Sequence, residues 1–298
     1  MKDRITRDIS NDFLKKLTTE DKYSMILNMA RENECLILPR KDKVNDKVKD
    51  KVIIYYQGQK VLEIGKDKVE KNEKIFLENS FVKKCKNKWA LKPFFEATKK
   101  IIELYPDKSD EKTKQQEMFF KINEENNDFF VFDMEYQQHK GKTEPRSENG
   151  GNDNPRPDLV AVKSDGTLVF VELKVGDKAL DGAQGIAGHL NSAKEFDKLQ
   201  EEEFSGMIKQ VVKLNYAEKL TDCEKIKKII KDDFKIIEKR EYIFALIGYK
   251  NKEKIKKRLD NQAQKAIKDM EELNWQVFFT ETEDLSELFT YDKYMKGL

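Results

Sequence analysis

The chain has 298 residues, of which 38% are hydrophobic, 38% are charged and 10% are aromatic. An average soluble domain has about 25% charged residues, and this aromatic content excludes a disordered chain. The composition therefore predicts a folded, highly charged protein of one or two domains. Apolar runs stay well short of the roughly 20 residues of a membrane span, and the charged N-terminus predicts no signal peptide. The scattered Cys35, Cys85 and Cys223 predict a reducing, cytoplasmic location and no zinc site.

The charges are unevenly distributed along the chain. Residues 1–110 hold 26 Lys and Arg against 19 Asp and Glu, whereas residues 111–298 hold 32 against 37. A basic part beside an acidic part suits an enzyme that acts on a polyanion, because one part attracts phosphates while the other holds a cation. Lysine-rich helix faces exposed to solvent give the same numbers, so this alternative stays open.

The first third of the chain predicts a small α+β unit. Helical spacing of apolar residues predicts a helix over 10–33, and Gly58 between two β-rich runs predicts a hairpin turn. In chain order, we expect that helix, a strand over 35–40, a charged loop over 41–51, a hairpin over 52–65, a strand over 75–82 and a helix that ends before Pro106. The polar segment 106–112 predicts a domain boundary, which gives an N-terminal module over 1–105 and a second domain over 106–298.

The second domain alternates helices and strands, which predicts a mixed α/β sheet covered by helices. A long polar loop over 137–156 interrupts this pattern. The expected elements are a helix over 111–126, strands over 129–136, 158–163 and 168–175, helices from 180 to 239, a strand over 242–249, a helix over 252–273 and a strand over 275–280.

Two carboxylates and a lysine gather at one end of the hairpin formed by 158–163 and 168–175. With Asp165 and Gly166 as a two-residue turn, Val160 would face Val171, and Asp158 would lie one residue out of phase with Glu172. A kink or a small register change would bring the two carboxylates together. Glu172 and Lys174 are two residues apart, so they share a face of the strand.

This grouping predicts a divalent metal site. Two neighbouring carboxylates form a hard oxygen site that suits Mg²⁺ or Mn²⁺, and Lys174 can stabilise charge on a phosphate. An exposed strand face with no chemical role is the alternative for Glu172 and Lys174 alone.

The motif Pro157-Asp158, then thirteen residues, then Glu172-Leu173-Lys174 resembles the PD-(D/E)xK phosphodiesterase superfamily. The resemblance covers roughly residues 111–200. It implies a restriction-endonuclease-like αβββαβ core with a mixed sheet flanked by helices, and metal-dependent hydrolysis of nucleic-acid phosphodiester bonds. It also implies that Asp158, Glu172 and the Leu173 carbonyl bind Mg²⁺ or Mn²⁺ and that Lys174 is the catalytic lysine.

Two further positions match habits of this superfamily. Glu117 falls on the helix before the sheet, where many members have an acidic residue, and Gln184 falls where members have a glutamine after the lysine strand. An ordinary surface carboxylate and an ordinary helix glutamine are the alternatives. Glu135 is a weaker candidate than Glu117, and for His189 a helix-surface or hydrogen-bonded role is favoured over contact with a substrate phosphate.

We therefore expect a cytoplasmic Mg²⁺-dependent nuclease, with DNA favoured over RNA as its substrate. Restriction or phage defence enters by analogy with the superfamily. The module over 1–105 would serve specificity, sensing or dimerisation, so a homodimer stays open, and no membrane partner is expected. Two rivals remain: a non-catalytic module of the same fold that binds nucleic acid or protein, and an interaction protein whose motif is coincidental.

Overall fold

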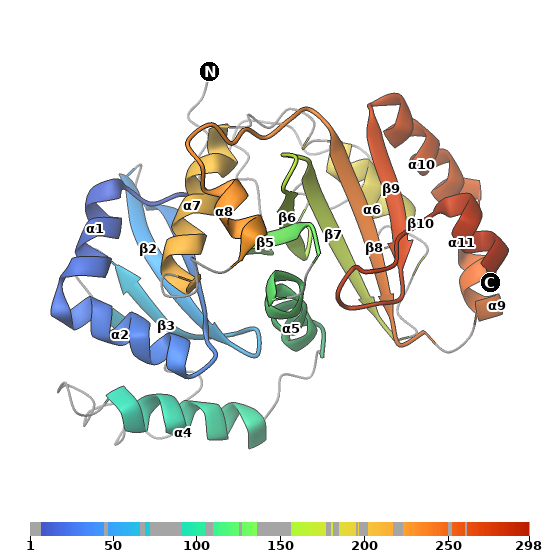
Figure 1. Ribbon diagram of the computed structural model, residues 1–298. Helices are drawn as coiled ribbons and strands as arrows, with labels where there is room; N and C mark the ends of the chain where they lie inside the picture. Colours follow the sequence, from blue (N-terminus) through green and yellow to red (C-terminus); the bar gives the residue numbers. More distant parts are fainter. Residues whose placement is uncertain are drawn as a thin grey trace. The chain divides into compact units, whose positions relative to one another are not determined.

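The fold is taken from a computed structural model of the chain (Figure 1). It describes residues 7–44, 47–65, 69–71, 91–104, 110–124, 127–135, 156–176, 180, 185–194, 196, 202–216, 223–249, 252–259 and 261–297. The predicted strand over 75–82 lies outside the described residues, as does almost all of the predicted loop over 137–156. No helix in these ranges is both long and apolar enough to span a lipid bilayer.

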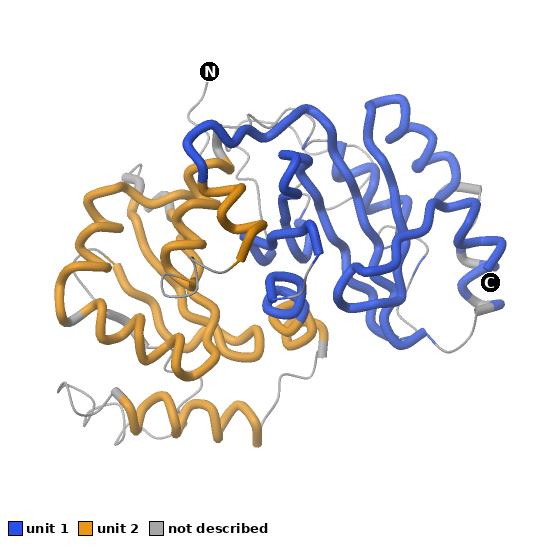
Figure 2. The backbone as a smooth tube through the Cα atoms, in the orientation of Figure 1, with its two compact units in different colours: residues 1–4, 118–202, 231–298 blue, residues 5–117, 203–230 orange. Residues whose placement is uncertain are grey.

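The chain divides into two compact units, which Figure 2 distinguishes by colour. The N-terminal unit consists of residues 5–117 and 203–230, and the C-terminal unit consists of residues 1–4, 118–202 and 231–298. One of the boundaries between them, after residue 117, falls within helix α5 (Asp110–Glu124). The predicted boundary lies after residue 105, and in this division the N-terminal unit also includes the later segment 203–230.

The N-terminal unit is built on a four-stranded antiparallel sheet in the order β1-β2-β3-β4. Its elements are α1 (Asn11–Thr19), α2 (Asp21–Glu32), β1 (Leu36–Val44), β2 (Lys47–Tyr56), β3 (Gln59–Gly65), β4 (Val69–Lys71), α4 (Leu91–Leu104), the first half of α5, α7 (Glu202–Tyr216) and α8 (Glu224–Ile229). The predicted helix over 10–33 is thus two helices that meet at Glu20. The predicted hairpin over 52–65 is confirmed by the pairing of β2 with β3.

The predicted charged loop over 41–51 is wrong, because β1 and β2 extend through it as paired strands. The register places Lys41 opposite Asp50 and Asp42 opposite Lys49. Opposite charges directly across an antiparallel pair stabilise the pairing. The high charge of this segment therefore does not exclude strands, because β1 and β2 pair along it.

Helix α7 is tied to the N-terminal unit by amide side chains that bond to distant backbone. Gln210 accepts a hydrogen bond from the Ile9 amide (2.8 Å) and donates one to the Ile9 carbonyl (2.6 Å). Asn215 makes the same pair of bonds with Ile37 on the edge strand β1 (2.8 and 2.7 Å). Leu214 is fully buried in the core of this unit. Local sequence pattern carries no information about such pairings, so the boundary prediction missed them.

The C-terminal unit is built on a six-stranded mixed sheet in the order β10-β9-β8-β7-β6-β5. Its strands are β5 (Phe129–Met134), β6 (Leu159–Lys163), β7 (Leu168–Val175), β8 (Arg240–Ile247), β9 (Trp275–Thr280) and β10 (Phe289–Thr290). Its helices are α6 (Ile186–Ala193), α9 (Lys252–Arg258), α10 (Asn261–Glu272) and α11 (Tyr291–Gly297). Strands β7, β8 and β9 run parallel and lie side by side (Figure 1), and the neighbouring pairs are antiparallel.

The central strands explain why the sequence specifies this sheet. Seven of the eight residues of β7 and of β8 are buried, as expected of parallel strands covered on both faces. The predicted mixed α/β class is confirmed, and so are the five predicted strands of this sheet. The short β10 and helix α11 were not predicted. Whether the core is restriction-endonuclease-like stays a prediction.

The turn between β6 and β7 has three residues, not the predicted two. Lys163 donates its N–H to the Thr167 carbonyl (2.9 Å), so Ser164, Asp165 and Gly166 form the loop. The Asp165 carboxylate accepts a bond from the Thr167 amide (2.8 Å), and Gly166 has a φ of +92°. A glycine in this conformation is characteristic of three-residue hairpin loops. The extra loop residue shifts the whole register by one residue.

We expect Gly166→Ala to lower the free energy of unfolding by about 1–3 kcal/mol, the usual cost of a strained backbone position. A β-carbon at Gly166 would lie 2.2 Å from the Lys235 carbonyl oxygen, in addition to the strain of a positive φ. Gly176→Ala is the matched control, since Gly176 has a φ of +63° but nothing within 4 Å of the added carbon. Denaturant unfolding of both variants checks this, and equal losses would contradict a role for the Lys235 contact.

Candidate functional site

The observed register brings Asp158 and Glu172 into phase. Leu159 pairs with Val171 and Val160 with Phe170, whereas the sequence predicted Val160 opposite Val171. Continued by one residue, this register places Asp158 opposite Glu172. The Lys163–Thr167 pair is hydrogen-bonded, so by alternation the Asp158–Glu172 position is a non-hydrogen-bonded one, where side chains come closest. The predicted one-residue mismatch is therefore wrong, and no kink is needed.

Backbone bonds fix Asp158 at the start of β6. Its carboxylate Oδ2 accepts a hydrogen bond from the Leu173 amide of β7 (2.7 Å). Its own carbonyl accepts one from the Glu135 amide at the end of β5 (2.8 Å). Asp158 is only 7% exposed. Bonds from the neighbouring strand ends on both sides, one to its carboxylate and one to its carbonyl, thus hold Asp158 in place.

Glu172 and Lys174 form a buried ion pair within the central strand β7. Their side chains are 4% and 9% exposed, and Lys174 Nζ lies 2.9 Å from Glu172 Oε1. Removing two charges from water costs several kcal/mol each, which only good geometry and further hydrogen bonds offset. A pair of apolar residues would fill a covered central strand at lower cost. The pair is therefore an exception to the strand pattern, and such exceptions are expected at functional sites.

His189 of α6 completes a three-residue cluster with this pair. Its Nε2 lies 3.1 Å from Glu172 Oε1 and 3.0 Å from Lys174 Nζ. A protonated Nε2 donates to the carboxylate, whereas an unprotonated Nε2 accepts from the ammonium. The position of the ring proton therefore determines whether His189 Nε2 donates to Glu172 or accepts from Lys174. Of the two roles favoured from sequence, helix-surface or hydrogen-bonded, the hydrogen-bonded one is confirmed.

Tyr242 of β8 lies near the same carboxylate and was not predicted. Its side chain is fully buried. Burial raises the pKa of Tyr242 well above its usual value, and the negative charges of Glu172 and Asp158 raise it further. A tyrosine inside an otherwise apolar buried strand is the sequence signal that could have found it, because a buried hydroxyl needs a partner.

The donor set at this edge fits a hard divalent cation. It offers the carboxylates of Asp158 and Glu172. It also offers the Leu173 carbonyl, because in an antiparallel pair one residue's N–H and C=O point to the same neighbour and the Leu173 N–H faces Asp158. Oxygen-only donors suit Mg²⁺ or Mn²⁺. In the described part of the chain, no group of three or more His, Cys, Asp or Glu side chains is arranged to hold a metal ion. A cation held by these two carboxylates would need a carbonyl or water as well.

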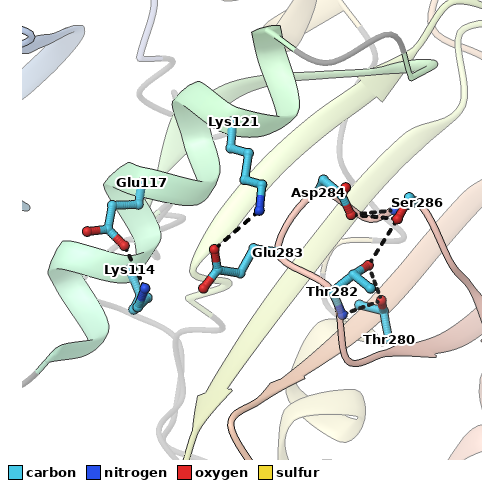
Figure 3. A network of polar contacts seen from close by, with 8 residues as sticks. All are labelled: Lys114, Glu117, Lys121, Thr280, Thr282, Glu283, Asp284 and Ser286. Carbon is cyan, nitrogen blue, oxygen red and sulfur yellow. Dashed lines mark hydrogen bonds and ion pairs between the residues drawn. The ribbon is translucent and has the colours of Figure 1, made fainter.

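Glu117 is engaged within its own helix. Its carboxylate lies 2.8 Å from Lys114 Nζ, and its side chain is 51% exposed. Figure 3 shows Glu117 turned toward Lys114, while Lys121 further along α5 reaches Glu283 (3.5 Å). Glu117 is also the last residue of α5 assigned to the N-terminal unit, whereas Asp158 and Glu172 belong to the C-terminal unit. Its role as an acidic site residue stays a prediction.

The two remaining candidates differ in what is described of them. Glu135 follows β5 with a φ of +50°, and its carboxylate pairs with Arg156. It contributes its backbone amide, not its carboxylate, to Asp158. Gln184 lies outside the described residues, so its predicted role at the phosphate or the water stays a prediction.

Comparisons with protein-family models, with curated proteins and with solved structures found no match to this chain. The functional argument therefore depends on the chemistry and geometry of the cluster itself.

Proposed function

We propose that this chain is a metal-dependent nuclease that hydrolyses nucleic-acid phosphodiester bonds, with DNA favoured over RNA. The observation that carries the proposal is the Asp158 carboxylate bound by the Leu173 amide beside Glu172, with the Lys174 ammonium 2.9 Å from the Glu172 carboxylate. The element order α5-β5-β6-β7-α6, with β8 then pairing parallel to β7, supports it. That order is the one implied by the resemblance to the PD-(D/E)xK superfamily.

Each residue of the cluster has a chemical task in this proposal. Asp158 and Glu172 hold the divalent cation together with the Leu173 carbonyl. A cation bound there would polarise a phosphate oxygen and activate water. Lys174 stabilises the negative charge that develops on the phosphate in the transition state. His189 keeps the lysine ammonium at the strand end through its Nε2 contact.

Cleavage assays test the proposal directly. Supercoiled and linear DNA, and RNA of the same sequence, are incubated with the purified chain and Mg²⁺ or Mn²⁺, with EDTA and Ca²⁺ as controls. The expected result is cleavage that requires Mg²⁺ or Mn²⁺ and is lost in the Asp158→Asn variant. Nucleic-acid binding without cleavage under every divalent ion would instead favour a non-catalytic binding module.

Binding of nucleic acid should weaken steeply with salt. Each neutralised phosphate of duplex DNA contributes a slope of about −0.9 to the dependence of log K on log salt concentration, and residues 1–110 carry 26 Lys and Arg. Fluorescence anisotropy in Ca²⁺, which separates binding from cleavage, measures this slope. A flat salt dependence, or no binding at low salt, would count against the nuclease proposal and for an interaction protein.

A further inference from the structure

The Lys174 ammonium has two neighbours, and one of them is a proposed metal ligand. Its Nζ lies 2.9 Å from Glu172 Oε1 and 3.0 Å from His189 Nε2. His189 Nε2 is in turn 3.1 Å from the same Glu172 oxygen. The three atoms therefore form a triangle in which every side is within hydrogen-bond distance.

A divalent cation and the Lys174 ammonium would compete for the Glu172 carboxylate. Both are attracted to it, and they repel each other. The side chains of Glu172 and Lys174 are only 4% and 9% exposed, so solvent screens this repulsion weakly. An ammonium that leaves Glu172 inside the protein also needs a new partner, because an unpaired buried charge is costly. A second acceptor close to the ammonium therefore favours cation binding.

His189 is placed to be this second acceptor. Helix α6 buries Ile186, Leu190 and Ala193. His189 falls on the same stripe by helical spacing, and its side chain is 18% exposed. An apolar residue would fill this face without the cost of burying a polar ring. A neutral imidazole has one unprotonated nitrogen, which accepts a hydrogen bond and carries no charge to repel a cation.

The donor chemistry does not favour His189 as a direct ligand of the cation. Among the described residues, Asp158, Glu172 and His189 do not form a group that could hold a metal ion. Oxygen donors suit Mg²⁺ and Mn²⁺, whereas imidazole suits zinc, copper, nickel and iron. The ring nitrogen already lies 3.0 Å from the lysine ammonium. The contact with Lys174 is therefore the one that the ring can serve when the cation is bound.

We infer that His189 is a positioning residue that holds the Lys174 ammonium when a divalent cation binds Glu172, so that the ammonium leaves the carboxylate oxygen to the cation. This inference rests on the proposed metal site and assigns His189 a part in metal affinity. Groups that act on a metal site from outside its ligands typically contribute 10–100-fold to metal affinity. His189 touches neither cation nor substrate in this arrangement and acts through Lys174.

The test is Mn²⁺ binding by isothermal titration calorimetry on the full chain. His189→Leu removes the acceptor and suits the apolar face of α6, and we expect Mn²⁺ affinity to fall about 10–100-fold. His189→Gln offers an amide oxygen to the ammonium and should keep most of the affinity. Lys194→Ala is the control: it removes the contact of Lys194, at the C-terminal end of α6, with Asp269 (2.9 Å) and should bind Mn²⁺ as the wild type does.

A double variant shows whether His189 acts through the lysine. In Lys174→Ala no ammonium competes for Glu172, so adding His189→Leu should leave Mn²⁺ affinity equal to that of Lys174→Ala alone. A double-mutant cycle measures this coupling. The inference is overturned if His189→Leu lowers Mn²⁺ affinity by the same factor with and without Lys174, or if His189→Gln loses as much affinity as His189→Leu.

Including Asp158→Asn in the series separates failure of the inference from failure of the metal site. If Asp158→Asn loses Mn²⁺ binding and His189→Leu keeps wild-type affinity, the positioning inference is overturned and the metal site stands. If the wild-type chain binds no Mn²⁺, or Asp158→Asn binds as well as wild type, the proposed metal site fails and the inference with it. Denaturant unfolding in EDTA checks that each variant folds, and failure of both His189 variants to fold would show a structural role and overturn the inference.

Discussion

Replacing Lys174 by alanine should slow phosphodiester cleavage about 10²–10³-fold, the usual cost of one well-placed electrostatic stabiliser. The Lys174 ammonium lies 2.9 Å from the Glu172 carboxylate. The second carboxylate, that of Asp158, is bound by the Leu173 amide at the same end of the hairpin. Its charge matters most when negative charge develops on the phosphate, so the loss should fall on the chemical step. Mn²⁺ affinity should stay equal or rise, because a positive charge beside the cation is removed. Single-turnover cleavage and calorimetry separate the two effects.

Lys163→Ala is the matched control for this prediction. Lys163 also pairs with a buried glutamate, Glu241 (2.6 Å), but at the turn end of the same hairpin. The Lys163→Ala substitution should lower the free energy of unfolding and leave the cleavage rate nearly unchanged. Lys174→Arg should restore activity only in part, because a planar fork replaces a compact ammonium. Equal losses in Lys163→Ala and Lys174→Ala would show that the effect is one of stability, and no loss in Lys174→Ala would require another stabiliser.

The motif residues could be found from sequence because the hairpin is local. Asp-Gly between two β-rich runs marks the turn, and alternation places Glu172 and Lys174 on one face. The loop length could not be found in this way, since two- and three-residue loops share the same glycine signal. The bond from the Thr167 amide to Asp165 favours the longer loop. That single residue decides whether Asp158 lies in or out of phase with Glu172.

The partners of the motif could not be predicted, because they come from distant parts of the chain. His189 and Tyr242 lie 17 and 70 positions after Glu172 in sequence, and only strand pairing and helix packing bring them near its carboxylate. The return of α7 to the N-terminal unit has the same origin, since Gln210 and Asn215 bond to backbone that precedes them by about 180–200 residues. Tertiary pairing, not local propensity, determines these features.

Burial changes what is expected when the two carboxylates are replaced. From a position at strand ends alone, both carboxylates would be expected to tolerate neutralisation without harm to the fold. Asp158 and Glu172 are in fact 7% and 3% exposed. In Asp158→Asn the amide oxygen can still accept the Leu173 N–H bond, so little stability should be lost. Glu172→Gln, however, leaves the buried Lys174 ammonium without its carboxylate.

Both variants should lose Mn²⁺ binding, and only one should lose much stability. Removing a direct ligand should weaken Mn²⁺ affinity by more than the 10–100-fold typical of a group that only orients a ligand. Glu172→Gln should also lower the free energy of unfolding in EDTA by about 3 kcal/mol, the lower end of the cost of breaking a buried ion pair. Calorimetry with Mn²⁺ and denaturant unfolding measure the two quantities separately.

Glu241→Gln is the control that separates the two effects. Glu241 is as buried as Glu172 and pairs with Lys163 (2.6 Å) and Lys239 (3.3 Å) at the turn end of the hairpin. It should lose stability as Glu172→Gln does and keep whatever Mn²⁺ affinity the wild-type chain has. Unchanged Mn²⁺ affinity in both Asp158→Asn and Glu172→Gln would remove the metal site, and the buried Glu172–Lys174 pair would then be a structural ion pair like that of Glu241.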